Sequence, residues 1–277
     1  MRPVLASAAF GERPRNQPFV ICVCGCVPAG LETSPTMFGE IKNFHGERID
    51  HTFHQGDANS KHLVILGHGV TGNKDRPFVV ALAEGLAAAG VNALRFSFAG
   101  NGASGGQFTD ATISKEVADL GSVLDAYAGW NVCYIGHSMG GAVGVLRAST
   151  DARIRLLVSL AGMVRTAAFA QREFGTVKPG AGFMWDDEKC PLSQAYMDDL
   201  AAIGTVLDAA PKIKVPWLLV HGTEDDVVPI QDSKDILIRA GTDTRFIPIK
   251  GANHVFAGEH TRLMVDTVVA WVKARMG

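Results

Sequence analysis

Ser138 stands in the motif G-H-S-M-G, residues 136–140, where a short apolar run gives way to a predicted helix. A nucleophilic serine needs such a place, because an abrupt turn from strand to helix lifts its hydroxyl clear of the sheet. Small residues two positions before and after it let the backbones approach, and the helix N-terminus supplies amide donors for an oxyanion. The motif alone also fits a helix-capping turn, but this context predicts a nucleophile.

A serine hydroxyl is a weak nucleophile at neutral pH and needs a general base. His254 lies in the segment G-A-N-H, residues 251–254, after the last predicted strand. This loop belongs at the edge of the sheet where Ser138 emerges, so we expect His254 to be the base. His260, at the start of the final predicted helix, is its competitor.

The base in turn needs a carboxylate that orients its ring and stabilises the imidazolium. The segment H-G-T-E-D-D-V-V-P, residues 221–229, follows the penultimate predicted strand and holds three acidic candidates. Asp225 is the preferred acid, Asp226 is the alternative, and Glu224 is third.

A glycine-rich turn, G-H-G-V-T-G-N-K at residues 67–74, follows the first predicted parallel strand. Such a turn can aim a backbone N–H at the carbonyl oxygen of an ester, so we assign the oxyanion donors to the N–H groups of Val70 and Met139. The turn is not a phosphate-binding loop, because it lacks the spacing G-x-x-x-x-G-K-[ST].

Strands and helices alternate from residue 37 onward. Short apolar runs predict buried parallel strands, and amphipathic segments between them predict helices. The alternation predicts an α/β fold with a doubly wound, mostly parallel sheet covered on both faces. The expected elements are a hairpin at 41–45 and 49–53, strands at 62–66, 92–98, 132–135, 154–160, 217–220 and 245–249, and helices at 77–90, 112–128, 142–148, 231–240 and 261–276.

The alternation stops at residues 163–210, which contain no clear strand but two plausible helices. Large apolar side chains in this stretch are candidates for lining an acyl or aromatic pocket. The simpler explanation for most of them is packing that joins the insertion to the body of the domain. The candidates are Phe169, Phe174, Phe183, Met184, Trp185 and Tyr196.

The composition is that of a globular protein, because 47% of the 277 residues are hydrophobic and 19% are charged, which excludes an intrinsically disordered chain. A formal net charge of -2 gives no sign of a nucleic-acid partner. No apolar run reaches the roughly 18 residues of a membrane-spanning helix. The sequence indicates no metal ion or cofactor, and it does not reveal the oligomeric state.

Residues 1–36 are predicted to form an extension that is poorly structured or signal-like. An apolar stretch follows early arginines, but no A-x-A cleavage site comes after it. Cys22, Cys24 and Cys26 do not have the usual spacing of zinc ligands, and an odd total of five cysteines argues against a disulfide framework. We expect a cytoplasmic protein, or an exported one if the extension acts as a signal.

Five segments resemble the α/β-hydrolase superfamily over residues 37–277: H-G-V-T-G-N-K, F-A-G-N-G-A-S-G-G, G-H-S-M-G-G, H-G-T-E-D-D-V-V-P and G-A-N-H. The chain order of serine, acid and histidine is also that of the superfamily. Within it, the sequence is similar to bacterial cinnamoyl/feruloyl-esterase-like carboxylesterases, which cleave esters through an acyl-enzyme. The resemblance implies that Asp225 is the catalytic acid, that Val70 and Met139 hold the oxyanion, and that 163–210 forms a short helical cap.

We therefore expect a serine esterase that hydrolyses small to medium acyl or aromatic esters, with Ser138, Asp225 and His254 as its triad. The same triad also suits a thioesterase, an acylglycerol lipase, a carbon–carbon bond hydrolase or an aminopeptidase. An alternative of another class is a non-catalytic hydrolase fold that binds a ligand. The complete set of serine, acid and base argues against that alternative, since a binding protein needs none of the three.

Overall fold

The computed structural model of the protein describes residues 39–276. The chain divides into two units, Met1–Pro35 and Thr36–Gly277, and the fold below is that of the second. The predicted extension at 1–36, with its three clustered cysteines, lies outside the described residues.

A seven-stranded sheet forms the centre of this unit, in the order β3-β5-β4-β6-β7-β8-β9. The edge strand β3 runs antiparallel to β5, and every other neighbouring pair is parallel. This confirms the predicted mostly parallel sheet. The strands are β3 (His51–His54), β4 (His62–Gly67), β5 (Asn92–Phe96), β6 (Asn131–His137), β7 (Ile154–Leu160), β8 (Trp217–Gly222) and β9 (Thr244–Ile249).

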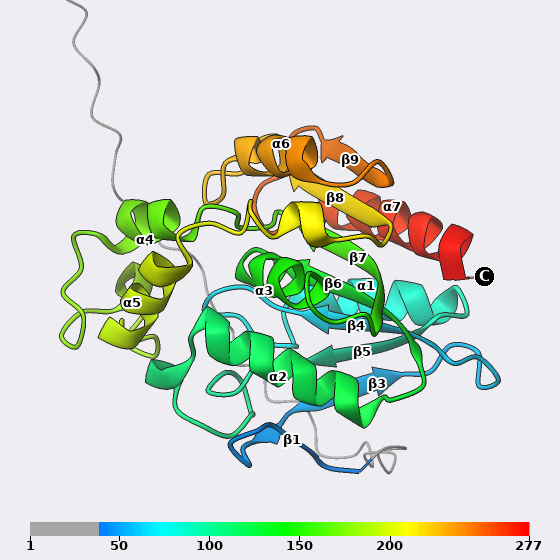
Figure 1. Cartoon of the computed structure of the whole chain (residues 1–277), viewed down its shortest axis with the longest axis horizontal. Helices are drawn as coiled ribbons and strands as arrows, with labels where there is room; N and C mark the ends of the chain where they lie inside the picture. Colours follow the sequence, from blue (N-terminus) through cyan, green and yellow to red (C-terminus); the bar gives the residue numbers. More distant parts are fainter. Residues whose placement is uncertain (1–38, 277) are drawn as a thin grey trace, which may run out of the picture. The chain divides into compact units, whose positions relative to one another are not determined.

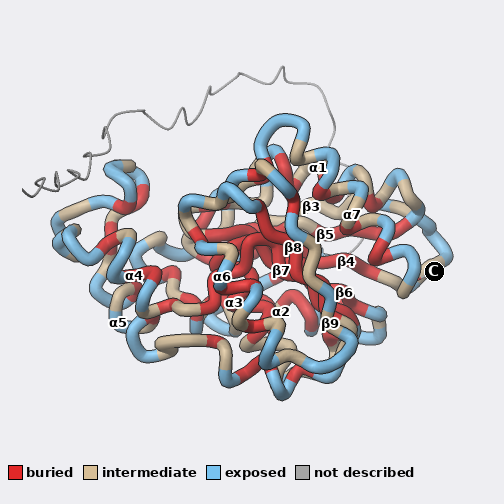
Figure 2. Tube along the Cα trace, turned by 90° about the horizontal axis from the view of Figure 1, so that it is seen from above, coloured by how far each residue is buried: buried red, intermediate tan, exposed pale blue. Residues whose placement is uncertain are grey.

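Both faces of the sheet are apolar, because successive side chains of a strand point to opposite sides. In β4, Leu63 and Ile65 belong to one buried cluster, whereas Val64 and Leu66 belong to the other. Figure 2 shows that buried residues follow the strands, while the outer sides of the helices are exposed. The first face packs against α2 (Ile113–Ala126), α3 (Met139–Ala148) and α6 (Ile230–Arg239), and the second against α1 (Pro77–Ala88) and α7 (Glu259–Met276) (Figure 1).

Two predicted elements differ from the structure. The stretch at 49–53 is not one strand: β2 (Arg48–Ile49) pairs with β1 (Ile41–Lys42) in a separate small sheet, and β3 pairs with β5. The two strands are separated at Asp50. Its N–H donates to Ser104 Oγ at 2.8 Å, and its carbonyl accepts the N–H of Ser97 at 2.9 Å. The second difference is α3, which begins at Met139 and not at residue 142.

The segment between β7 and β8, residues 163–210, is called the β7–β8 insertion. It contains α4 (Thr166–Phe174), the short helix η2 (Met184–Asp186), α5 (Gln194–Ile203) and the start of η3 (Ala210–Lys212). Figure 1 places α4 and α5 beyond the ends of the parallel strands. Asp199 in α5 accepts hydrogen bonds from the backbone N–H and the hydroxyl of Ser114, so the insertion is fixed to the start of α2.

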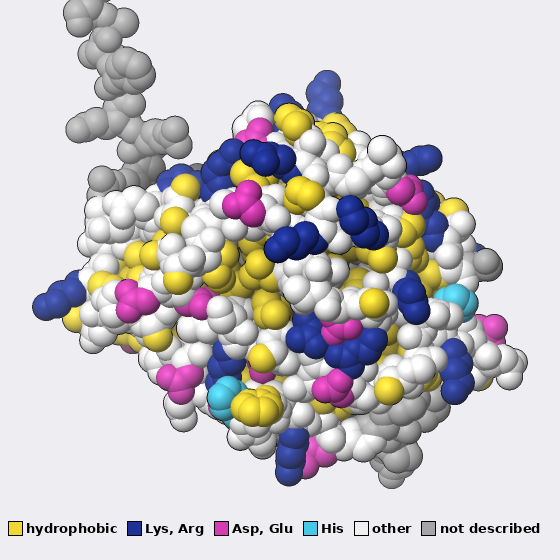
Figure 3. Space-filling model, in the orientation of Figure 1, with side chains coloured by type: hydrophobic (Ala, Val, Ile, Leu, Met, Phe, Trp, Pro, Cys, Tyr) yellow, Lys and Arg dark blue, Asp and Glu magenta, His cyan; other side chains and the backbone are white. Residues whose placement is uncertain are grey.

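Basic and acidic side chains are interspersed on the face of the molecule shown in Figure 3, and neither sign forms one continuous patch there. Ion pairs also join neighbouring side chains, such as Arg147 with Asp151 at 2.7 Å. Among the described residues, no helix has the length and apolar character needed to cross a lipid bilayer.

Glu116 of α2 is a fully buried carboxyl group, and neither of its oxygens has a hydrogen-bond partner within residues 39–276. Burial raises its pKa well above the usual range, and the nearby carboxylates of Asp119 and Asp199 raise it further. Glu116 is therefore protonated in the folded protein at pH values where a solvated glutamate is ionised.

The variant Glu116→Gln is expected to be more stable than the wild type at neutral pH and equally stable in acid. The folded state retains a proton that the unfolded chain loses above a pH of about 4.3. The wild-type free energy of unfolding is therefore highest, as far as Glu116 affects it, below that pH, and it falls as the pH rises towards the raised pKa. Glutamine has no proton to lose, so the variant lacks this fall. Urea denaturation at pH 8 should show a gain of about 1 kcal/mol or more, because each unit by which folding raises the pKa of Glu116 costs the wild type roughly that much at high pH. A gain of the same size in acid would contradict this account.

Candidate active site

Ser138 occupies the sharp turn between β6 and α3. Its backbone angles are φ 53° and ψ -117°, a combination that costs a non-glycine residue energy and persists only when the surroundings impose it. The N–H of Ser138 donates to the carbonyl of Leu160, and the carbonyl of Ser138 accepts the N–H of Met163, both at 2.9 Å. These bonds to the end of β7 and the loop beyond it hold the strained turn in place.

Close backbone packing surrounds this turn. A Cβ atom added to Gly136 would lie 2.0 Å from the carbonyl oxygen of Gly140, and one added to Gly140 would lie 2.5 Å from the carbonyl oxygen of His68, so no side chain fits at either position. Glycine is therefore required on steric grounds at both flanking positions of the motif. The same close packing lets α3 begin directly after the serine.

The loop after β4 comes equally close to the nucleophile. A Cβ atom added to Gly69 would lie 2.8 Å from Cβ of Ser138. His68 holds the loop, because its Nε2 accepts the N–H of Phe98 at 3.1 Å and its Nδ1 donates to the carbonyl of Gly69 at 2.9 Å. Burial lowers the pKa of His68 to about 4, so the ring stays neutral with one donor and one acceptor.

Two backbone N–H groups at this place are available to a ligand. Val70 follows Gly69, and its N–H has no hydrogen-bond acceptor among the described residues. Met139 follows Ser138 as the first residue of α3, and the first N–H groups of a helix have no acceptor within the helix. The predicted oxyanion donors therefore lie on two segments that meet at the serine.

His254 and Asp225 form a direct hydrogen bond, with Nδ1 of His254 2.8 Å from Oδ2 of Asp225. The carboxylate is fully buried, and 12% of the imidazole surface is exposed. An ionised carboxylate only accepts, so in the neutral ring Nδ1 carries the proton and Nε2 has its lone pair. This is the tautomer that a general base requires.

Asp225 is surrounded by donors. Its Oδ1 accepts the N–H groups of Val227 at 2.9 Å and Val228 at 2.8 Å. Burial alone would raise the pKa of Asp225, but hydrogen bonds from His221 and His254 outweigh it and hold the pKa well below the usual range. The group is therefore a carboxylate at neutral pH.

His254 is placed beside the nucleophile turn by His137, the residue before Ser138. Nε2 of His137 donates to the carbonyl of His254 at 2.9 Å, and the two ring centroids are 4.7 Å apart. Burial lowers the pKa of His137 to about 3, so this ring does not compete as a proton acceptor at neutral pH. The bond links the two segments that carry the candidate serine and base.

The competing candidates do not join this group. Asp226 and Glu224 are exposed, and no hydrogen bond joins either of their side chains to His254 in the described part of the chain. His260 lies in the first turn of α7, where its ring faces Gly251. The structure therefore brings Asp225, His254 and the Ser138 turn together and leaves the other three residues outside.

A further histidine in the group was not among the sequence candidates for this site. Nε2 of His221 lies 3.1 Å from Oδ2 of Asp225, the oxygen that also contacts His254. The spacing H-x-x-x-D in residues 221–225 is the signal for it. That spacing lies in a turn, where it does not by itself place two side chains in contact.

The predicted pocket residues form mainly an aromatic cluster inside the β7–β8 insertion. Phe169, Phe174 and Tyr196 are buried, and Phe174 packs edge-on against Trp185, with ring centroids 4.9 Å apart. Met184 is buried as well, whereas Phe183 is 37% exposed and Trp185 is 44% exposed. Most of the set thus packs within the insertion.

Tyr196 connects that cluster to the site. Its hydroxyl donates to Sδ of Met139 at 3.5 Å, which places α5 of the insertion over the first turn of α3. Within residues 39–276, no three His, Cys, Asp or Glu side chains are grouped to bind a metal ion.

Several known proteins resemble this chain in sequence or in structure. YfhR of Salmonella typhimurium is 24% identical over 270 residues, which cover 92% of this chain and 85% of that protein. The mitochondrial palmitoyl-protein thioesterase ABHD10 of Bos taurus is 27% identical over 205 residues, covering 69% of this chain and 66% of its own length. The solved structure of Est1E from Butyrivibrio proteoclasticus with bound ferulic acid has a TM-score of 0.74 at 24% identity, covering 86% of this chain and 98% of that one.

A sequence model of the alpha/beta hydrolase family matches residues 63–267. The match runs from β4, which precedes the glycine-rich loop, into α7, so it includes the three segments that carry Ser138, Asp225 and His254. The predicted resemblance and fold class are thereby confirmed: the chain belongs to the alpha/beta hydrolase family.

Proposed function

We propose that this hydrolase is a serine esterase, in which Ser138 attacks the carbonyl carbon of an ester. The observation that carries the proposal is the 2.8 Å hydrogen bond between His254 and Asp225 beside the strained turn at Ser138. It provides an oriented base with a free Nε2 next to Ser138, which stands between a parallel strand and a helix N-terminus. These are the parts that acyl transfer requires.

In the first half of the reaction, Nε2 of His254 takes the proton from Ser138 Oγ as the oxygen forms a bond to the carbonyl carbon. The negative charge that develops on the carbonyl oxygen is held by the N–H groups of Val70 and Met139. Collapse of this intermediate breaks the bond to the leaving oxygen. His254 gives that oxygen its proton, so the alcohol departs and an acyl-Ser138 ester remains.

In the second half, His254 removes a proton from water, which attacks the acyl carbon. The bond to Ser138 Oγ then breaks, the serine regains its proton from His254, and the acid is released. Asp225 stays ionised throughout, since its pKa is held far below neutral. It keeps the ring in the right tautomer and stabilises the imidazolium in both halves.

Small to medium acyl or aromatic esters are the proposed substrates. We propose that the β7–β8 insertion acts as a cap over the site, because Tyr196 brings α5 against Met139. Aromatic side chains are concentrated in this insertion, and the structurally similar Est1E binds ferulic acid. A hydroxycinnamoyl ester is therefore a natural member of the substrate panel.

Thioester hydrolysis is a second candidate, supported by the 27% sequence identity to the thioesterase ABHD10. The same serine, base and oxyanion donors act on a thioester, and only the leaving group differs. The two candidates thus share a site and are separated by rate constants, because substrate choice is set by the pocket and not by the fold.

Purified protein should release p-nitrophenol from p-nitrophenyl acetate with an initial burst of about one equivalent per chain, followed by slower turnover, which is the kinetic sign of an acyl-enzyme. A panel of p-nitrophenyl esters, a hydroxycinnamoyl ester and an acyl thioester then ranks kcat/KM by class. Turnover of the esters above the thioester supports the esterase. The reverse order would replace it by the thioesterase, and absence of turnover on every member would refute both.

A further inference from the structure

We propose that His221 is a positioning residue for the reaction: it donates a second hydrogen bond to Oδ2 of Asp225 and so fixes the oxygen that orients His254. The inference rests on the proposed function and deepens it, since it assigns a task to a second histidine of the same site. His221 makes contacts with Asp225, Val228 and Ser233 that the triad itself does not need.

The contacts of His221 leave one protonation pattern at Nε2. This nitrogen lies 3.1 Å from Oδ2 of Asp225 and 2.9 Å from the carbonyl oxygen of Val228. Both partners only accept, so Nε2 must carry a proton, which bonds the Val228 carbonyl and leaves Oδ2 of Asp225 in contact at the longer distance. His221 lowers the pKa of Asp225, as His254 does, so Oδ2 faces the N–H groups of both rings.

A buried serine holds the other side of the ring. Oγ of Ser233, in the first turn of α6, lies 2.8 Å from Nδ1 of His221. His221 and its partner are buried, with exposed fractions of 0% and 1%. In neutral His221 the serine hydroxyl donates to Nδ1, so the ring is held at both nitrogens and cannot turn without losing bonds that water does not replace.

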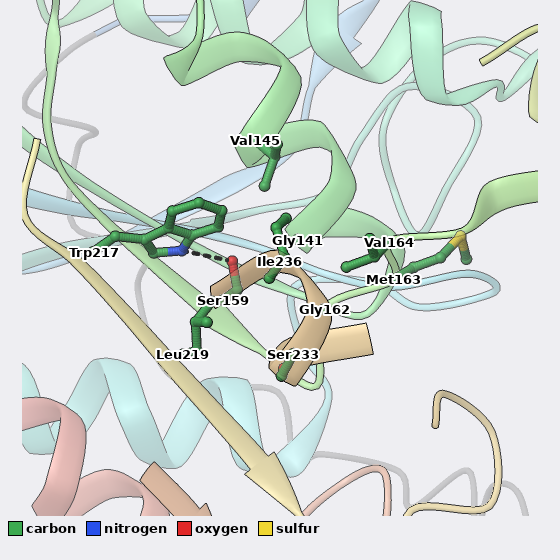
Figure 4. A pocket seen from close by; sticks show the side chains of 10 residues that line it. All are labelled: Gly141, Val145, Ser159, Gly162, Met163, Val164, Trp217, Leu219, Ser233 and Ile236. Carbon is green, nitrogen blue, oxygen red and sulfur yellow. Dashed lines mark hydrogen bonds between the residues drawn. The ribbon is translucent and has the colours of Figure 1, made fainter. Parts of the chain in front are cut away.

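The packing behind Ser233 is tight but leaves a small cavity of about 10 Å³, roughly one water molecule in size. Figure 4 shows Ser233 and Ile236 of α6 on one side of it and Trp217 with Ser159 on another. Nε1 of Trp217 donates to Oγ of Ser159 at 3.1 Å. Ser233, which lines this space, is also the residue that holds Nδ1 of His221.

The arrangement has a chemical consequence for the base. With Oδ1 held by two backbone N–H groups, the direction of Oδ2 decides where the His254 ring points. Removing the His221 donor lets the carboxylate shift towards His254 and leaves more negative charge on Oδ2. The ring is then less well oriented for the serine, and its imidazolium is stabilised more strongly.

The test compares His221→Leu with His221→Gln, in which the amide nitrogen takes the place of Nε2. We expect His221→Leu to lower kcat on p-nitrophenyl acetate by about 10²-fold, the usual effect of an ångström-scale misplacement, with KM little changed. The acidic limb of the pH profile of kcat/KM should move to higher pH. His137, the other titratable ring beside His254, stays neutral over this range because its pKa is lowered to about 3. His221→Gln should recover most of the loss.

Ile236→Ala is the matched control, because Ile236 is buried beside the same cavity and its apolar side chain can offer neither Asp225 nor His254 a hydrogen bond. It also removes packing near α6 but should keep the wild-type kcat and pH limb. A His221→Leu variant whose kcat equals that of Ile236→Ala would overturn the inference. So would a His221→Gln variant as impaired as the leucine variant, since the donor would then not be the cause.

A measurement that needs no substrate turnover tests the positioning role of His221 independently of whether the protein is an esterase. The Nδ1 proton of His254 gives a downfield ¹H NMR resonance when it is hydrogen-bonded to a carboxylate. We expect that resonance to move further downfield in folded His221→Leu and to stay in place in Ile236→Ala. An unchanged resonance in His221→Leu would overturn the positioning role even if the wild type proved to hydrolyse no ester.

Discussion

Ser138→Ala should lower kcat on p-nitrophenyl acetate by about 10⁶-fold, the loss seen when a triad hydrolase lacks its nucleophile. The substitution removes one oxygen atom and leaves the backbone able to keep the strained turn, because the backbone of residue 138 keeps its hydrogen bonds with Leu160 and Met163. Binding and the oxyanion donors survive, so a weak residual rate over water remains. Initial rates and the burst amplitude measure the effect, and the burst should vanish.

Ser149→Ala is the matched control for this variant. Ser149 lies at the other end of α3, where its hydroxyl donates to the carbonyl of Leu146 at 2.7 Å. This change should leave kcat within a factor of about two, as expected for a site outside the chemistry. Retention of most activity by folded Ser138→Ala would contradict the proposed nucleophile.

Asp225→Asn is expected to lower kcat by about 10⁴-fold while the protein stays folded. The amide oxygen of the variant can take the place of Oδ1 and accept the backbone N–H groups of Val227 and Val228. The amide nitrogen then faces Nδ1 of His254 and can only donate. His254 must turn to the other tautomer, which places its proton on Nε2 and removes the base from Ser138.

Asp226→Asn serves as the control, because its side chain is exposed and adjacent in the chain. The control should keep kcat near the wild-type value, and both variants should unfold at similar temperatures. Equal losses for the two variants would show that local disruption is responsible, and a full rate for Asp225→Asn would remove Asp225 from the proposed triad.

Local patterns in the sequence are sufficient to place most elements of the fold. The strand β7 has the predicted bounds of 154–160, and α1 begins at the predicted Pro77. Thr112 was expected at the start of α2, and its Oγ1 caps that helix by accepting the N–H of Lys115 at 3.2 Å. These features depend on neighbours in the chain, which is why period and capping residues reveal them.

Elements decided by distant contacts could not be placed in the same way. Gly140 and Gly141 have low helix propensity, so the sequence predicts a later start for α3. The helix nevertheless begins at Met139, because the nucleophile turn requires close contact between Gly136 and Gly140. The split at Asp50 likewise depends on a partner residue, Ser104, that only the folded chain brings near.

In the candidate site, too, some features follow from local sequence and others depend on distant contacts. The order of serine, acid and histidine and the choice of Asp225 come from motifs and from the resemblance. The contact of Asp225 with both His254 and His221 depends on how the loops after β8 and β9 come together, and spacing does not encode that. The aromatic residues of the insertion are a third case, since a list of side chains does not say whether they line a pocket or pack together.

Covalent labelling with a fluorophosphonate tests the central claim most directly, because the probe reacts with a serine only when base and oxyanion donors activate it. Folded wild-type protein should gain one adduct per chain, and peptide mass spectrometry should place it on Ser138. Ser138→Ala should gain none, and Asp225→Asn should react far more slowly. A folded wild-type protein that remains unlabelled, or an adduct on another serine, would contradict the account.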